Sequence, residues 1–221
     1  MIVHMNWSKH GGEGRRGYHH GNLREALIRG ALALIAEKGP AGFTIADAAR
    51  SAGVSPAAPY RHFRDRDDLM ADVARLGFEE FTARLSAAWD GGQPNPFRAF
   101  EAVGKAYLAF AREEPAFYAA MFDAGTPAEP TPELRQASEQ AFGVLREAAD
   151  AICQTLPKDK RPPAMMMALH VWAVSHGIAS LFGRGGKGGR KTPMSPEELL
   201  EAAMLIYFQG LGINLGGGAT P

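Results

Sequence analysis

Residues 44–63, TIADAARSAGVSPAAPYRHF, open with a short helix that a tight turn ends. Thr44 can cap this helix, because its hydroxyl can accept a backbone N–H while Asp47, three residues on, reaches back in a capping box. The apolar residues that follow Thr44 fall on one face of the helix. Gly53 then stands where a left-handed residue usually ends a helix.

A second short helix is expected directly after the turn. Val54 would fill the angle between the two helices, and Ser55 followed by Pro56 forms a second cap with proline at the first helical position. This order is typical of a helix-turn-helix, whose second helix enters the DNA major groove. Any two small helices around a glycine would give a similar pattern, so the stretch alone leaves DNA binding open.

The flanking sequence adds helices on both sides of this stretch. Residues 18–39 space their apolar side chains as in a helix with one buried face. Downstream, FRDRDDLM (residues 63–70) begins another helix with Asp65 as its cap. Three helices and the start of a fourth therefore form one small unit.

This unit resembles the N-terminal domain of TetR-type transcriptional regulators over about residues 20–70. The matching residues are ALALIAEKG (31–39), Phe43-Thr44-Ile45, Ala48, Ala49, Ala52-Gly53-Val54-Ser55, Tyr60-Arg61-His62-Phe63, Arg66 and Leu69. Further along, His170-Val171-Trp172 with His176-Gly177 is similar to a tryptophan-histidine-glycine signature of one subgroup of TetR-type ligand domains.

The resemblance implies an all-α protein of about nine helices. It places a three-helix DNA-binding domain at residues 18–66 and a helical bundle for effector binding and dimerisation at residues 67–221. Such a protein binds a palindromic double-stranded operator as a homodimer.

The resemblance also implies roles for single residues in the DNA-binding domain. Phosphate or sugar contacts are expected from Thr44, Tyr60, His62 and Arg66, and base contacts from Ser55, Ala57 and Ala58. Pro59 departs from the family pattern, since a proline there removes one helix hydrogen bond and puts the groove-facing set in doubt.

The charge distribution agrees with a DNA-binding N-terminal third. The whole chain has zero net charge, yet residues 1–66 carry 10 Lys or Arg against 5 acidic residues, and residues 67–221 carry 14 against 19. A basic head on an acidic body suits binding of a polyanion by the head alone.

Residues 1–17 form the segment before the first helix and are polar and glycine-rich. Arg15 and Arg16 make them a basic arm that can reach phosphates or a minor groove, the alternative being a tail without function. The segment lacks the apolar run of a signal peptide, and Cys153 is the only cysteine, so we expect a cytoplasmic protein. His19 and His20 have no third ligand at a recognisable spacing, so no metal and no cofactor are expected.

Residues 97–123 are rich in aromatic side chains within a body that is predicted to be helical throughout. Core packing explains most of them, but such a body can also enclose a cavity for a small apolar or amphipathic effector. The expected lining is Phe100, Tyr107, Phe110, Phe117, Met121, Phe122, Phe142, Met166 and His170.

Two C-terminal segments, residues 164–183 and 202–221, carry no charged side chain. A membrane helix is rejected because of the histidines in the first segment and the glycines that break the second. A soluble helix that is apolar on nearly all sides must be covered, so a second copy of the chain is expected to pack there. The expected interface is Trp172, His176, Gly177, Leu181, Leu199, Ala203, Ile206, Tyr207 and Gly210.

GRGGKGGRKT, residues 183–192, approaches a phosphate-binding loop but has Arg190 where glycine is needed, so it is interpreted as a solvated loop. The sequence therefore predicts a ligand-responsive repressor. An architectural DNA-binding protein without effector remains the alternative. An all-helical enzyme that uses the aromatic cavity is a further one, although no nucleophile and base pair, metal motif or cofactor loop supports it.

Overall fold

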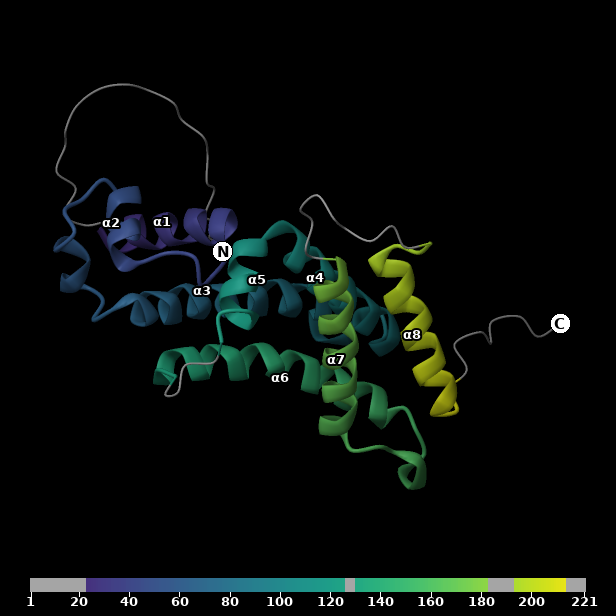
Figure 1. Ribbon diagram of the computed structural model, residues 1–221. Coiled ribbons are helices and arrows are strands. Elements are labelled where there is room, and N and C mark those ends of the chain that lie inside the picture. The colour runs from purple at the N-terminus through teal and green to yellow at the C-terminus, as the bar shows by residue number, and fades with distance from the viewer. Residues whose placement is uncertain (1–22, 126–129, 183–192, 214–221) are drawn as a thin grey trace.

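The computed structural model describes residues 23–125, 130–182 and 193–213. In these ranges the chain forms eight α-helices and no strand, so the predicted all-α class is confirmed (Figure 1). Their bounds are α1 (Leu23–Lys38), α2 (Ile45–Ser51), α3 (Arg66–Trp89), α4 (Pro96–Glu113), α5 (Pro115–Phe122), α6 (Pro132–Gln154), α7 (Ala164–Phe182) and α8 (Pro196–Gly210). The basic arm with Arg15 and Arg16 and the loop 183–192 lie outside the described residues.

Side-chain caps fix where the helices begin. Thr44 accepts the Asp47 N–H at 3.2 Å while the Asp47 carboxylate accepts the Thr44 N–H at 2.9 Å, which is the predicted capping box. Ser195 forms a second capping box with Glu198 at the start of α8. Asp65, Asn95 and Thr131 cap α3, α4 and α6 through a side-chain oxygen that accepts the N–H three residues on, and the Asp65 cap was predicted. These short polar side chains satisfy N–H groups that have no partner inside their helices.

The segment expected as the second helix of the helix-turn-helix is not an α-helix. Gly53 has a φ of +70° and ends α2 as predicted, but Ala58–Arg61 then form one short 3₁₀ turn, η1. Pro59 has no N–H to donate to the carbonyl of Ser55, and that carbonyl instead accepts the Ala58 N–H at 3.0 Å. Ser55 is therefore not a helix cap, and eight α-helices replace the expected nine among the residues that the structure describes.

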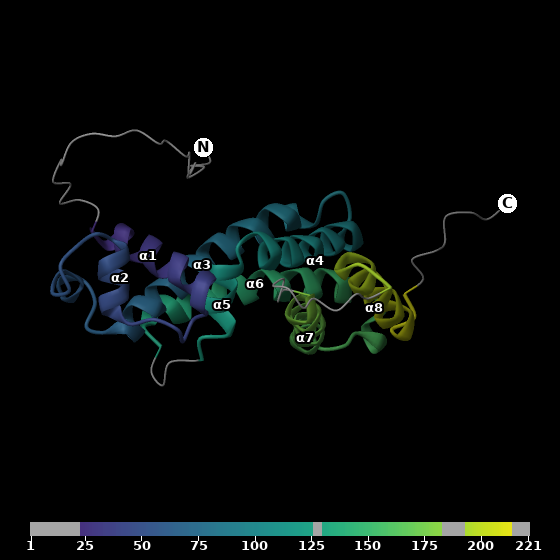
Figure 2. The ribbon, with the colours of Figure 1, turned by 45° about the horizontal axis from the view of Figure 1, so that its top comes forward.

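Two large hydrophobic cores and one small cluster lie along the described part of the molecule. The first joins α1, α2 and the first half of α3 around Leu27, Phe43, Phe63 and Leu69, and we call this part the head. The second fills the space between α3, α4, α6, α7 and α8, and we call this part the body. Both views place the head at one end of the molecule and α8 at the other, with α3 reaching from the head into the body (Figures 1 and 2).

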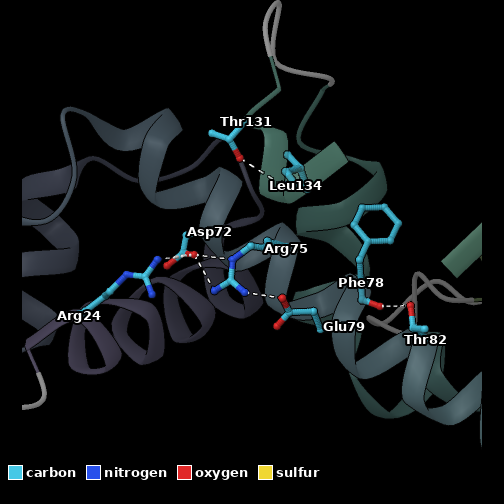
Figure 3. Close-up of polar contacts among 8 residues, drawn as sticks. All are labelled: Arg24, Asp72, Arg75, Phe78, Glu79, Thr82, Thr131 and Leu134. Atoms are coloured by element: carbon cyan, nitrogen blue, oxygen red, sulfur yellow. Dashed lines mark hydrogen bonds and ion pairs between the residues drawn. The ribbon is translucent and has the colours of Figure 1, made fainter. Parts of the chain in front are cut away.

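A buried carboxylate connects α1 to α3. One oxygen of Asp72, Oδ1, accepts from Arg24 of α1 at 2.8 Å and from Arg75 of α3 at 2.9 Å, and Arg75 continues to Glu79 (Figure 3). Asp72 is only 7% exposed, and its second oxygen has no partner among the described residues. The arginine of the head therefore compensates part of the cost of burying this carboxylate.

Helices α3 and α6 lie side by side and run in the same direction. Leu134 near the start of α6 packs against Ala71 and Ala74 of α3, and near the other end the Trp89 indole donates to Glu147 at 2.9 Å. The two helices therefore keep the same faces toward each other along their length.

Helix α7 is long and apolar enough to cross a membrane by length and composition. Six of its residues are nevertheless buried against the rest of the chain, among them Met167, Val171 and Ile178. One face of α7 therefore packs on the body, which agrees with the rejection of a membrane helix.

Candidate functional site

The head presents an exposed segment around the turn and η1. Ser55, Ala57 and His62 are exposed, and Tyr60 is 59% exposed, whereas Ala58 is half-buried. Pro59 and Phe63 are buried beneath them and anchor the segment to the first core. Pro59 and Phe63 thus fix the segment to the core of the head, while its other side chains face solvent.

Arg61 belongs to this exposed segment and was missed by the sequence reasoning. It lies between Tyr60 and His62, is exposed, and forms no ion pair within the described residues. The run of alternating aromatic and basic residues, Tyr-Arg-His-Phe-Arg, was the signal that could have found it. Arg64 is also exposed, but its guanidinium binds Asp68 at 3.2 Å, and this hydrogen bond lowers the pKa of the Asp68 carboxyl.

Arg66, expected to contact a phosphate, makes three contacts inside the chain. Its Nε donates to the carbonyl of Phe43 at 3.1 Å, a second nitrogen donates to the carbonyl of Pro40, and a third binds Asp67 at 2.8 Å. All three nitrogens are therefore used inside the chain, and Arg66 joins the α1–α2 connection to the start of α3. A guanidinium has five N–H groups and these contacts use three, so a phosphate contact by Arg66 stays a prediction.

Thr44 is exposed, but its hydroxyl proton is also used. The hydroxyl donates to Asp47 Oδ2 at 2.7 Å and accepts the Asp47 N–H. The hydrogen bonds from Thr44 lower the pKa of Asp47, which keeps the acceptor charged. The structure therefore assigns Thr44 to the cap of α2 and leaves it no proton for a phosphate oxygen.

The body contains a cavity of about 930 Å³ between α3, α5, α6 and α7. We call it the α3–α6 trough, because most of its lining comes from the facing sides of those two helices. Its apolar lining is Met70, Ala71, Ala74, Phe78, Phe81, Ala120, Met121, Phe122, Ala124, Gly125, Pro130, Leu134, Ala141, Phe142, Leu145, Met165 and Trp172. Its polar and charged lining is Arg66, Asp67, Arg135, Ser138, Glu139 and Arg146.

The aromatic residues predicted for the cavity divide into two groups. Met121, Phe122 and Phe142 line the trough, as expected. Tyr107 and Phe110 do not, because both are fully buried and pack edge-on or tilted against Phe81 in the core.

The other predicted lining residues also lie elsewhere. Phe100 packs on Phe208 of α8, with ring centroids 5.7 Å apart, and Phe117 lies against Gly77 of α3. Met166 and His170 are exposed on the outer side of α7, where His170 Nδ1 is 3.2 Å from the hydroxyl of Tyr207. Phe100 belongs to α4, which packs against α3, α6, α7 and α8, so its aromatic residues fill the core.

Trp172 and His176, expected in a dimer interface, instead point into the body. The Trp172 indole lines the trough and donates its N–H to the Tyr107 hydroxyl at 3.2 Å. His176 Nδ1 is hydrogen-bonded with the Tyr118 hydroxyl at 2.7 Å, and the two rings stack. Burial raises the pKa of both tyrosines, so they remain neutral partners in a network that connects α4, α5 and α7.

The outer sides of α7 and α8 carry exposed apolar side chains. Ile206 is 70% exposed and Leu181 is 59% exposed, and Leu169 and Leu205 are also exposed. Gly177 and Gly210 are exposed, and a Cβ at Gly177 would meet nothing within 4 Å. Leu199, Ala203 and Tyr207 are half-buried. This apolar surface is of the kind that marks protein contacts.

Two family models match the chain. The model "Bacterial regulatory proteins, tetR family" matches residues 27–73, and "Tetracyclin repressor-like, C-terminal domain" matches residues 100–206. Together they cover more than half of the chain. No curated protein matched the sequence.

Several solved structures share the fold. A protein with unknown function from Rhodococcus sp. RHA1 is 30% identical, with a TM-score of 0.73 over 89% of this chain and 98% of that one. The TetR family transcriptional regulator PfmR from Thermus thermophilus is 20% identical, with a TM-score of 0.58 over 83% of this chain and 97% of that one. AibR, solved in complex with isovaleryl coenzyme A and operator DNA, is 16% identical, with a TM-score of 0.62 over 83% of this chain and 96% of that one.

Proposed function

Because the chain belongs to the TetR family and is a DNA-binding transcriptional regulator, we propose that it acts as a ligand-responsive repressor. Two copies bind a palindromic operator. When an effector binds in the α3–α6 trough, the protein dissociates from the operator. The observation that carries this proposal is the position of Arg66, which lines the trough and also holds the head through the carbonyls of Pro40 and Phe43.

We assign DNA contact to the exposed segment from Ser55 to His62. Tyr60, Arg61 and His62 lie on the solvent side and can reach phosphates or sugars, while Ser55, Ala57 and Ala58 can approach base edges. These last three side chains carry few hydrogen-bonding groups, so DNA shape and the basic arm at residues 1–17 supply the remaining selectivity.

Two copies are proposed to pair through the exposed apolar sides of α7 and α8. The head lies at the opposite end of the molecule, so pairing there leaves both heads free to reach one DNA duplex (Figure 2). Trp172, His176 and Gly177 stand where the tryptophan-histidine-glycine subgroup has its signature, and we place the chain in that subgroup. The protein is expected to work in the cytoplasm and without a cofactor.

The domain division is proposed as 18–66 for DNA binding and 67–221 for effector binding and dimerisation. Effector binding shifts the protein between a geometry that fits the operator and one that does not, and it can do so only by its difference in affinity for the two. AibR shows, by its complex with a ligand and operator DNA, that this fold accommodates both partners.

The test is selection of a duplex from a random-sequence library by the purified full-length protein, followed by a salt titration of the selected duplex. We expect a two-fold symmetric site whose affinity falls steeply as salt rises, because bound phosphates release counterions. Recovery of no preferred duplex, or affinity independent of salt, would contradict the proposal. An architectural protein would bind DNA without enrichment of one symmetric site.

A further inference from the structure

Arg24, the second residue of α1, joins three parts of the head. Its guanidinium binds the Asp72 carboxylate of α3 at 2.8 Å, and its Cζ atom lies 6.0 Å from the centroid of the Phe63 ring. Phe63 is buried and directly follows residues 55–62, to which we assign DNA contact and which we now call the DNA-contact segment. One side chain therefore connects α1, the DNA-contact segment and the helix that reaches into the body.

The apolar contacts between α1 and α3 hold the two helices together but are weakly directional. Leu27 of α1 shares the core of the head with Leu69 and Val73 of α3, and the burial of such side chains favours no particular direction. Asp72 adds a contact between charged groups at one defined point near the start of α1. The ion pair therefore restricts the angle between α1 and α3 more than the apolar contacts do alone.

The Asp72 carboxylate can lose Arg24 without being left unpaired. Its Oδ1 atom accepts from both Arg24 and Arg75, which lie on either side of it in Figure 3. Arg75 is held on α3 by a second ion pair, to Glu79, whereas 51% of the Arg24 side chain is exposed. Removing the partner of a buried charge is strongly destabilising, but here Arg75 remains when Arg24 leaves. The contact between α1 and Asp72 can therefore open while the protein stays folded.

We propose that the Arg24–Asp72 ion pair is a releasable latch that sets the position of the DNA-contact segment relative to α3. When the latch is closed, it fixes the angle at which each head meets the DNA, so the dimer accepts only one spacing between its two half-sites. When it is open, α1 and the segment can move on α3, and the dimer tolerates other spacings. This inference rests on the proposed function, because half-site spacing matters only when two copies bind one palindromic duplex.

The experiment measures the spacing discrimination of the full-length protein. We define it as the affinity for the selected duplex divided by the affinity for the same duplex with one base pair added between the half-sites. The added pair moves one half-site by about 3.4 Å and turns it by about 35°. Arg24→Gln opens the latch and should lower the discrimination at least about fivefold, the effect of a half-exposed ion pair. Arg24→Lys keeps the charge and should restore most of it.

Asp72→Asn separates the latch from a direct phosphate contact by Arg24. Loss of a cation that touches DNA would weaken binding to both duplexes alike and reduce the salt slope by about one. Asp72→Asn removes a negative charge, so it cannot remove a phosphate contact. It opens the same latch, however, and should lower the discrimination as Arg24→Gln does. The double variant should be no worse than either single variant, because all three lose one and the same contact.

Two control variants leave the latch intact. Lys38→Gln removes an exposed cation from the last turn of α1, and Thr44→Ala destabilises the head through the cap of α2. Both should keep the spacing discrimination of the parent protein, the second in spite of its lower melting temperature. Melting curves show which variants fold, and Arg24→Gln is expected to fold because Arg75 still binds Asp72. If Asp72→Asn does not fold, the salt slope of Arg24→Gln separates the two roles of Arg24.

A proportional loss of affinity for both duplexes in Arg24→Gln, with a smaller salt slope, would overturn the inference and make Arg24 a phosphate contact. Unchanged discrimination in both Arg24→Gln and Asp72→Asn would also overturn it. In either case the parent protein has still selected a symmetric duplex, so the proposed function stands. If the parent protein selects no symmetric duplex, the proposed function fails, and the inference that rests on it fails as well.

Discussion

At the scale of single residues, whether a side chain is already hydrogen-bonded decides what it can bind. Thr44 and Arg66 occupy positions that suggested DNA contact, yet Thr44 uses its hydroxyl proton and Arg66 uses three of its five N–H groups within the chain. Arg61 has no such internal partner among the described residues. Residue type and position were readable from the sequence, whereas the internal partners of a donor were not.

Arg61→Ala should lower affinity for the selected duplex about tenfold and reduce the slope of log affinity against log salt by about one, because one phosphate contact is lost. The loss should be similar on specific and random DNA. Arg98→Ala on α4 removes an equally exposed cation far from the head and serves as the control. An unchanged salt slope in Arg61→Ala would show that this arginine does not reach the backbone.

Thr44→Ala should lower the melting temperature at neutral pH by about 3 °C, because the capping box of α2 is lost. The hydrogen bonds from Thr44 hold the pKa of Asp47 below its ordinary 3.8, so their stabilisation is complete above pH 3.8 and is lost as the pH falls through the lower pKa of the folded state. The melting temperature of the variant should therefore depend less on acid pH. Thr82→Ala, which removes a hydroxyl bonded to a carbonyl, should keep the pH dependence of the parent.

At the scale of helices, the sequence was most informative about where each one begins. Thr44 and Asp65 were recognisable as caps because a cap depends on residues that are close in the sequence. The sequence did not show that residues 58–61 form a 3₁₀ turn instead of an α-helix. That choice depends on how the buried Pro59 packs and on which carbonyl groups lack an N–H donor. Apart from Met121, Phe122 and Phe142, the lining of the trough was missed for a related reason. It lies between α3 and α6, and no local pattern tells which faces of two distant helices meet.

The contact between α4 and α8 depends on Gly104, where a Cβ would lie 2.9 Å from the Cδ2 atom of Leu200. Gly104→Val should therefore displace α8 and lower the free energy of unfolding by about 1–3 kcal/mol, measured by denaturant titration at fixed protein concentration. Gly143→Ala on α6 meets nothing within 4 Å and should instead stabilise by about 0.5–1 kcal/mol. Equal effects of the two substitutions would show that α8 does not pack as described.

At the scale of the whole molecule, the positive charge is concentrated in the DNA-binding third and the exposed apolar surface at the opposite end. The first was evident from the sequence, because charge can be counted along the chain. The exposed apolar surface was only partly evident from the sequence. Trp172 and His176 resemble the neighbouring residues of α7 in polarity, yet their side chains point into the body.

Ile206→Glu should raise the dissociation constant of the dimer at least about tenfold, because the 70%-exposed side chain would place a charge in the proposed contact between copies. Operator affinity should fall when the dimer is weakened, because two unlinked heads no longer bind the two half-sites at a high effective concentration. Sedimentation velocity over a range of concentrations measures the first effect. Ala83→Glu, an exposed change on α3, should alter neither quantity. A monomeric parent protein would contradict this prediction at once.

The continuity of α3 has a mechanical consequence. This single helix of 24 residues starts at the Arg66 anchor and ends at Trp89 in the core of the body. It is a rod of about 36 Å, so a swing of about ten degrees about one end moves the other by about 6 Å. A small tilt of α3 caused by a bound effector would thus move the head relative to the operator by about the width of a minor groove.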